Sequence, residues 1–273
     1  MRSRVSLAAI GVALAVTASS LEAQGDRFEW TGRIDRGDRI EVKGITGDIR
    51  AVATSGSRVE VVAVKRGRRR NFDEVQFEVV EDDDGVTICA VYPERRSSRR
   101  RRGEPYECRP GGWRNNVDIV DVDVDVDVDF EIRVPSGVRF TGRTISGDVE
   151  AENLDAFVLA RTVNGDIYVS TSDLADAVTV TGSIEVAMGR ADWRGDLEFH
   201  AVSGDITISL PKSLNTEIEF ESLSGDMDSD FPIAITSCED RWIGGRISGT
   251  IGEGGRSLSL RTISGNVRLQ RGR

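Results

Sequence analysis

The 273-residue chain lacks most of the residues on which common enzyme sites depend. Its one histidine is His200, and it has neither a G-x-S-x-G sequence nor the Lys-Ser/Thr of a phosphate-binding loop. These absences disfavour a Ser-His-Asp hydrolase and a P-loop protein. Acidic residues are plentiful, so the sequence leaves open a carboxylate pair of the kind that cleaves glycosides. No convincing catalytic set remains, and we expect a protein that is not an enzyme.

Long apolar runs are absent after residue 23, so we expect no transmembrane segment in the rest of the chain. Residues 1–23 have the pattern of a secretory signal peptide. Arg2 and Arg4 precede an apolar run over residues 5–16, and small residues lead to a plausible cleavage site after Ala23. We therefore expect export to the periplasm, the outer cell surface or the medium.

Basic residues and cysteines are also limited. Asp and Glu outnumber Lys and Arg by 46 to 36, and the formal net charge of −10 argues against a nucleic-acid partner. The three cysteines include neither a CxxC pair nor a set of zinc ligands. In an oxidising compartment we expect a Cys89–Cys108 disulfide, which would stabilise the fold by about 3 kcal/mol on the chain-entropy estimate. Cys238 is then left free, and we expect it to be buried.

Glycine, in contrast, is abundant, and eight glycines mark copies of one short motif. In each copy a polar residue, usually Asp, and then an aliphatic residue follow the glycine. The marker glycines are Gly47, Gly147, Gly165, Gly182, Gly204, Gly225, Gly249 and Gly265. The last seven lie 16 to 24 residues apart, a spacing typical of stacked-strand repeats. No segment has a sustained helical period, so the sequence predicts an all-β fold.

Aliphatic residues recur at fixed positions relative to these glycines, namely −7, −5, −2, +2 and +4. Around Gly165 they are Val158, Ala160, Val163, Ile167 and Val169. Steps of two predict strands with one buried face, whereas the step from −5 to −2 predicts a bend. A second bend is expected at the glycine, which tolerates positive φ. We expect all five positions to face the core, with the Gly182 and Gly249 copies irregular.

The acids that follow five of the glycines would form a ladder if successive coils stack in register. They are Asp48, Asp148, Asp166, Asp205 and Asp226. Such a ladder could bind cations or sugar hydroxyls, or it could accept backbone N–H groups at each corner. Ser183, Thr250 and Asn266 take the same place in other copies, and they are poorer cation ligands. This substitution favours the structural role.

An acidic strand and a basic loop precede the regular repeats. Six carboxylates alternate with apolar residues along the strand and form a candidate calcium site: Asp121, Asp123, Asp125, Asp127, Asp129 and Glu131. They are about 6.6–7 Å apart along one strand face, so they cannot chelate one ion without further ligands. The alternative is a solvated edge that discourages aggregation. The loop carries Arg95, Arg96, Arg99, Arg100, Arg101 and Arg102, which could pair with these acids or bind an anionic partner.

The motifs Thr-Ile-Ser-Gly-Asp-Val (144–149), Thr-Val-Asn-Gly-Asp-Ile (162–167) and Thr-Ile-Ser-Gly-Asn-Val (262–267) resemble the repeats of a bacterial putative-adhesin family. The preceding Val-Pro-Ser-Gly-Val (134–138) resembles the usual entry into those repeats. The resemblance covers about residues 38–52 and 134–270. It implies a single-stranded β-solenoid (β-helix) in a cell-envelope setting, and it supplies no catalytic residues.

Together these patterns predict a signal peptide over 1–23 and an N-terminal β portion over 24–137, which holds one repeat, the Arg-rich loop and the Asp-Val strand. Regular solenoid repeats are expected over 138–273. The expected function is that of a non-enzymatic exported adhesin or envelope scaffold, with a surface or matrix polysaccharide or another envelope protein as partner. The alternatives are a polysaccharide lyase or hydrolase on a β-helix and a calcium-binding structural module.

Overall fold

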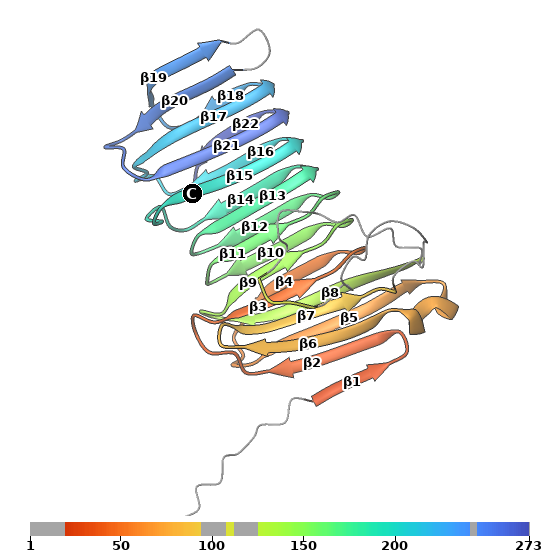
Figure 1. Ribbon diagram of the computed structural model, residues 1–273. Coiled ribbons are helices and arrows are strands. Elements are labelled where there is room, and N and C mark those ends of the chain that lie inside the picture. Colours follow the sequence, from red (N-terminus) through yellow and green to blue (C-terminus); the bar gives the residue numbers. More distant parts are fainter. Residues whose placement is uncertain (1–19, 94–107, 112–124, 241–244, 273) are drawn as a thin grey trace, which may run out of the picture.

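The computed structural model describes residues 20–93, 108–111, 125–240 and 245–272 (Figure 1). These residues form two sheets of eleven strands each, which confirms the prediction of an all-β fold. Their single helical element is a 3-10 helix, η1 (Arg69–Glu74). Within the described ranges, no helix is long and apolar enough to cross a membrane. Most of the predicted signal peptide lies outside the described residues.

The first sheet, sheet A, has the following strands in spatial order: β1 (Ser20–Gln24), β2 (Arg27–Gly32), β5 (Val59–Gly67), β8 (Val126–Pro135), β4 (Ile49–Thr54), β10 (Val149–Leu154), β12 (Ile167–Thr171), β14 (Ile184–Met188), β16 (Ile206–Leu210), β22 (Val267–Arg271) and β18 (Met227–Ser229). The second, sheet B, has β19 (Ile233–Asp240), β20 (Gly245–Ile251), β17 (Thr216–Ser224), β21 (Ser257–Ser264), β15 (Asp196–Ser203), β13 (Ala175–Thr181), β11 (Val158–Arg161), β9 (Arg139–Arg143), β3 (Arg39–Lys43), β7 (Gly85–Val91) and β6 (Gln76–Asp82).

Each repeat forms one coil, with one strand in each sheet. The chain runs along a strand of sheet B, turns at the marker glycine and returns along a strand of sheet A. Successive coils β9–β10, β11–β12, β13–β14 and β15–β16 pair in parallel through both sheets. The fold is therefore solenoid-like, with two open sheets facing each other across one core.

The coils at both ends depart from chain order, which corrects the expectation of successive layers. Coil β21–β22 lies between β15–β16 and β17–β18, although it comes last in the chain. This coil keeps the full apolar register, whereas β17–β18 loses it at Ser229, so the complete coil occupies the interior position. Coil β7–β8 likewise lies outside β3–β4. Antiparallel strands extend the sheets beyond the outer coils, namely β5, β2, β1 and β6 at one end and β20 and β19 at the other.

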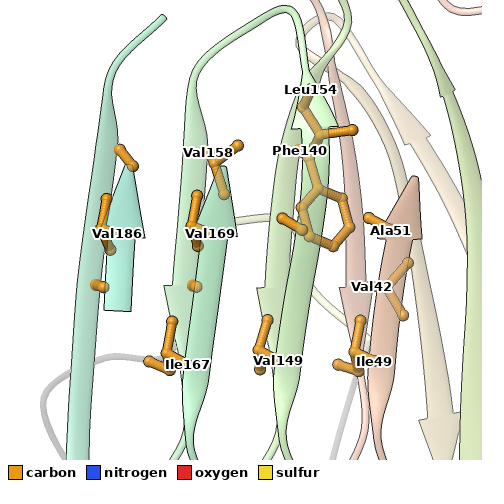
Figure 2. Close-up of a cluster of buried hydrophobic side chains, with 14 of the residues drawn as sticks. Val42, Ile49, Ala51, Phe140, Val149, Leu154, Val158, Ile167, Val169 and Val186 are labelled. Atoms are coloured by element: carbon orange, nitrogen blue, oxygen red, sulfur yellow. The ribbon is translucent and has the colours of Figure 1, made fainter. Parts of the chain in front are cut away.

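Aliphatic rows fill the space between the two sheets. Ile49, Val149 and Ile167 occupy one row at position +2 of neighbouring coils, and Figure 2 shows them side by side. All three are completely buried. The core is continuous from Phe28 to Leu269. At about 25 cal/mol per Å² of apolar surface removed from water, these rows dominate the stability of the fold.

The predicted bend between positions −5 and −2 is wrong. From the Gly165 coil onward, alternation continues through −7, −5 and −3, so position −3 faces the core and position −2 faces outward. In the Gly47 coil, by contrast, Ile45 at −2 is only 3% exposed, as expected. Thr162 at −3 is 4% exposed, whereas Ile263 at −2 is 46% exposed. Hydrophobicity alone predicts a buried aliphatic residue at −2 and an exposed threonine at −3. Burial of threonine is favourable only when its hydroxyl has a hydrogen-bond partner.

Three further expectations need correction. Gly249 is not a corner glycine, since it lies within β20 and pairs with Ile218 and Ile235 in an antiparallel arrangement. Gly182, in contrast, marks a regular coil whose core residues at −7 and −5 are the small Ala175 and Ala177. Cys238 is free and exposed because sheet A does not extend far enough to cover β19.

Gly165→Ala tests the packing at the corners. Gly165 has φ +159, and a Cβ there would overlap the carbonyl group of Gly147 in the neighbouring coil. Gly195 also has positive φ, +77, but a Cβ there would meet no atom within 4 Å. We expect Gly195→Ala to cost only the local strain, about 1–3 kcal/mol, and Gly165→Ala to cost clearly more in urea unfolding. Equal losses for the two variants would contradict close packing of the glycines.

Candidate functional site

The most repetitive surface of the molecule is the corner at which the coils turn from sheet B into sheet A. Seven of the eight marker glycines lie there in one column, in the spatial order Gly47, Gly147, Gly165, Gly182, Gly204, Gly265 and Gly225. Their φ angles lie between +110 and +159. The first six donate their N–H to a backbone carbonyl of the next coil at 2.8–3.0 Å. A side chain at any of the seven would overlap backbone atoms of the adjacent coil.

The acids after the glycines form a second ladder parallel to the glycine column. Asp148 N donates to Asp48 Oδ1 at 2.9 Å, Asp166 N to Asp148 Oδ1 at 2.8 Å, and Ser183 N to Asp166 Oδ1 at 2.7 Å. Farther along, Asn266 repeats this role, because its Oδ1 accepts the N–H of Asp226 at 3.0 Å. The carboxylates therefore accept backbone hydrogen bonds between coils, which an amide can do equally well.

Threonine hydroxyls make the third set of corner contacts, on the side facing the core. Thr162 Oγ1 donates to Gly147 O at 2.9 Å, and Thr179 Oγ1 donates to Gly165 O at 3.1 Å. Thr144 and Thr262 make the same bond to Gly47 and Gly204. These four glycine carbonyls are thus bonded from the next coil, which explains why threonine is tolerated at the buried −3 position of those coils.

Outside the column, the −2 residues form an apolar row that we term the corner stripe. It comprises Val163, Val180, Val202, Ile263 and Leu223 in spatial order. Val180, Ile263 and Leu223 are 39%, 46% and 47% exposed. An exposed hydroxyl or amide side chain at −1 lies beside each residue of the stripe. The Asp ladder, at position +1, lies on the other side of the glycine column. The stripe repeats about every 4.8 Å, which is the spacing of neighbouring strands.

One coil lacks a glycine corner, and Tyr92 takes part in closing it. The chain leaves β7 there and returns at β8, and Tyr92 is only 3% exposed. Its hydroxyl donates to Val126 O at 3.1 Å and lies 3.2 Å from Thr46 Oγ1 in the adjacent coil. Burial raises the pKa of Tyr92 to about 12. No repeat pattern marks this residue, so sequence reasoning missed it.

A buried ionic cluster covers the outer face of sheet B near β3, and it was also missed. Glu41 is completely buried, with Oε1 3.0 Å from Arg143 Nε and 3.5 Å from Lys43 Nζ. Its Oε2 accepts the N–H of Gly111 at 2.9 Å and the hydroxyl of Thr87 at 3.3 Å. Burial lowers the pKa of Lys43 despite the nearby carboxylate. The cluster could not be predicted from strand alternation, because alternation places Glu41 on the outer face of the sheet, where a solvent-exposed side chain is expected.

The disulfide holds the segment that covers this cluster. Cys89 and Cys108 are bonded, with their Cα atoms 5.8 Å apart. Residues 108–111 lie across β3, where Lys43 Nζ donates to the carbonyl of Arg109 and Gly111 binds Glu41. The cluster and the disulfide therefore anchor residues 108–111, which lie within the long connection between β7 and β8, to sheet B.

The acidic strand is only partly described. Asp121 and Asp123 lie outside the described residues, as do the six arginines of the basic loop. Asp125, Asp127, Asp129 and Glu131 lie at or beside β8, next to the antiparallel strand β5. Asp129 forms an ion pair with Arg66, and Asp125 Oδ2 lies 3.6 Å from Arg68 Nε. The partners visible here are thus arginines of the β5 region, which the sequence analysis did not consider.

Other candidate residues do not converge on a site. His200 is half-buried on β15, opposite Val178 and Arg261 of the flanking strands. Trp193 is 3% exposed and donates its indole N–H to Ser257 O, so it belongs to the core. Across the described ranges, no three His, Cys, Asp or Glu side chains gather as a metal site.

A comparison with protein families matches the model of Toastrack DUF4097 over residues 115–270, more than half of the chain. The chain belongs to the Toastrack DUF4097 family. The matched region contains every coil from β9–β10 onward. This finding confirms the resemblance drawn from the repeat motifs, and the family name denotes no enzymatic activity.

Solved structures with a related shape include two of bacterial origin. A "putative cell adhesion protein" from Clostridium sporogenes is 10% identical, with a TM-score of 0.44 over 89% of this chain and 99% of its own. A "putative adhesin" from Bacteroides fragilis is 12% identical, with a TM-score of 0.35 over 90% of this chain and 98% of its own. No curated protein matches the chain.

The buried Tyr92 predicts a loss of stability at alkaline pH. Its pKa is raised from 10.0 to about 12 in the folded state, so the folded chain holds this proton more tightly than the unfolded chain. The resulting stability is fully present below pH 10 and is lost as the pH rises toward 12, roughly 3 kcal/mol in all. Tyr92→Phe, compared with the wild type in denaturant unfolding from pH 8 to 12, should lack this loss. Identical pH profiles for the two proteins would contradict the prediction.

Proposed function

We propose that this Toastrack protein is an exported, non-enzymatic binding module of the cell envelope. Its single-stranded solenoid windings would present the same corner surface once per coil to a repetitive partner. The observation that carries this proposal is the corner stripe, a row of five aliphatic side chains beside the covered rows of the core. Val180, Ile263 and Leu223 of this row are exposed, and Val163 and Val202 are half-buried. Continuous exposed apolar surface of this kind is typical of interaction sites.

A cell-surface or matrix polysaccharide fits the chemistry of this corner best. The carbon-rich faces of sugar rings can pack against Val180, Val202 and Ile263. The hydroxyl groups of Thr181 and Ser203 lie in the next row and can exchange hydrogen bonds with sugar hydroxyls. Each contact is weak, but a polymer that spans several coils binds them together, and the combined affinity greatly exceeds that of one contact.

Export is supported by the signal-peptide pattern and by the disulfide, which forms and persists in oxidising compartments. An oxidising compartment and an envelope setting agree with each other, and both would bring the corner surface close to polysaccharides. Recovery of the chain from the periplasm, cell surface or medium, and not from the cytoplasm, tests this part of the proposal.

A double variant, Val180→Glu with Ile263→Glu, tests the binding surface. It adds two charges to the stripe without entering the core, so the fold should persist while retention on immobilised cell-wall and matrix polysaccharides falls at least tenfold. Ala187→Glu, an exposed position in sheet A away from the corner, is the matched control and should bind like the wild type. Equal binding by both variants, or no binding by the wild type to any polysaccharide, would refute the proposed site.

The same assay addresses the two alternative functions. We propose that binding needs no metal, so retention should be the same in calcium and in chelator. Loss of binding in chelator would favour a calcium-dependent module instead. Release of shortened sugar chains during the assay would favour a carbohydrate-active enzyme.

A further inference from the structure

The two sheets end unevenly at the C-terminal side of the solenoid. Beyond the coil β17–β18, sheet B continues with β20 and then β19, whereas sheet A has no further strand among the described residues. In Figure 1, β19 and β20 form the upper end of the molecule, beyond β18. Two strands of sheet B therefore extend past the sheet that would normally cover them.

The inner face of this two-strand extension is apolar. Ile247 pairs with Phe220, and Phe220 is a core residue that is 4% exposed, so Ile247 lies on the core-facing side. Across the next pairing, Ile235 and Cys238 of β19 lie on the same side. Among the described residues none covers them, since Ile235 is 62% exposed, the highest value of any large hydrophobic residue described, and Cys238 is exposed as well.

Part of this end is already closed. The chain crosses from β18 to β19 at residues 230–232, and Phe231 of this crossing is 4% exposed. Arg271 lies over its ring, 5.4 Å from the centroid. The open part is therefore the half that lies toward the glycine corner, around Ile235, Cys238 and Ile247.

The outer edge of β19 is only weakly protected, by an irregularity between Ile235 and Ser237 and by the two acids at its end. Its eight residues, Ile-Ala-Ile-Thr-Ser-Cys-Glu-Asp, contain no Pro, Lys or Arg. Edge strands usually carry such residues, which block pairing with another chain. An apolar inner face beside a weakly protected edge is the kind of surface that a partner can cover.

We propose that a second copy of this chain covers this end, related to the first by a twofold axis that runs parallel to the strands between the two sheets. This axis places sheet B of each copy in line with sheet A of the other. The two extra strands of one copy then fill the positions that the other copy lacks. Each side of the joint gains the same number of strands, so both sheets continue without a gap.

Strand direction agrees with this arrangement. The coil strands of sheet A run opposite to those of sheet B, because the chain reverses at every glycine corner. β19 runs in the direction of β17, since two successive antiparallel pairings separate them. A twofold axis parallel to the strands leaves the direction of every strand unchanged. β18 of one copy and β19 of the other therefore meet as an antiparallel pair.

The proposed joint buries the same apolar face of each copy. The Ile235–Cys238–Ile247 face of each copy packs against the same face of the other, about 10 Å apart at the backbone as in stacked sheets. At this separation the two Cys238 Cα atoms are too far apart for a direct disulfide. Since the axis keeps both glycine corners on one edge, the corner stripes of the two copies lie on the same edge of the dimer.

Sedimentation equilibrium of Ile235→Glu tests this joint. The wild type should be a dimer, and the variant should be monomeric or dissociate at least tenfold more readily, because it would bury an unpaired charge in the interface. Ile263→Glu is the matched control, since Ile263 is a similarly exposed aliphatic residue of the corner stripe, and it should remain dimeric. A monomeric wild type at about 100 µM, where a micromolar interface is filled, would overturn the proposal, and so would an unchanged Ile235→Glu dimer.

A thiol crosslinker gives a second measurement that does not depend on how the variants fold. Cys89 and Cys108 form a disulfide, so Cys238 is the remaining thiol of the chain. A bis-maleimide with a spacer of about 10 Å, the separation of packed sheets, should link the wild type into covalent dimers. Failure to crosslink while the reagent modifies Cys238 fully would also overturn the proposal. Neither experiment depends on polysaccharide binding, so the two proposals fail separately.

Discussion

The structure depends on the close approach of backbones at the glycine corner. Each coil must reverse direction where the carbonyl group of the previous coil already occupies the space that a Cβ would need. Glycine alone meets this condition while it adopts the positive φ that the turn requires. Once the corner is in place, the strands on either side fall into parallel register, and the aliphatic rows at −7, −5, +2 and +4 meet in one core. The Thr and Asp ladders then satisfy the polar groups that the turn leaves behind.

This arrangement also determines which surfaces are available for function. From the Gly165 coil onward, the −2 side chain lies outside the core, and at Val180, Ile263 and Leu223 it is exposed. The two ends of the solenoid pose a different problem, since a stack of coils has exposed edges. Antiparallel strands and η1 cover the N-terminal end, where Phe28 stacks on Phe77 at 4.6 Å. At the C-terminal end sheet B extends beyond sheet A, and the proposed joint between two copies rests on this difference.

Much of this fold could be predicted from the sequence, because the same pattern of glycine and apolar residues recurs in coil after coil. The glycines, four of the five apolar positions and the Cys89–Cys108 pair are local features of the sequence. The sequence predicted a buried −2 and an exposed −3 position because threonine is a polar residue. Its burial at −3 is explained only by the glycine carbonyl of another coil that accepts its hydroxyl, and this contact is not visible in the sequence. Gly249 was misassigned for a similar reason, since Ile-Ser-Gly-Thr-Ile (247–251) fits the motif yet pairs antiparallel. The order of the coils, Tyr92 and Glu41 all depend on contacts between distant residues, which a single sequence does not reveal.

Amide hydrogen exchange at the corner tests the central claim most directly. If the glycine column is as firmly held as the strands, the amides of Gly147, Gly165, Gly182, Gly204 and Gly265 should exchange only through global unfolding. Their protection should equal that of core-strand amides such as Val169, although they lie in turns. Exchange as fast as at the open turn of Gly195 would show that the corners are ordinary loops, and the account of this fold would then be wrong.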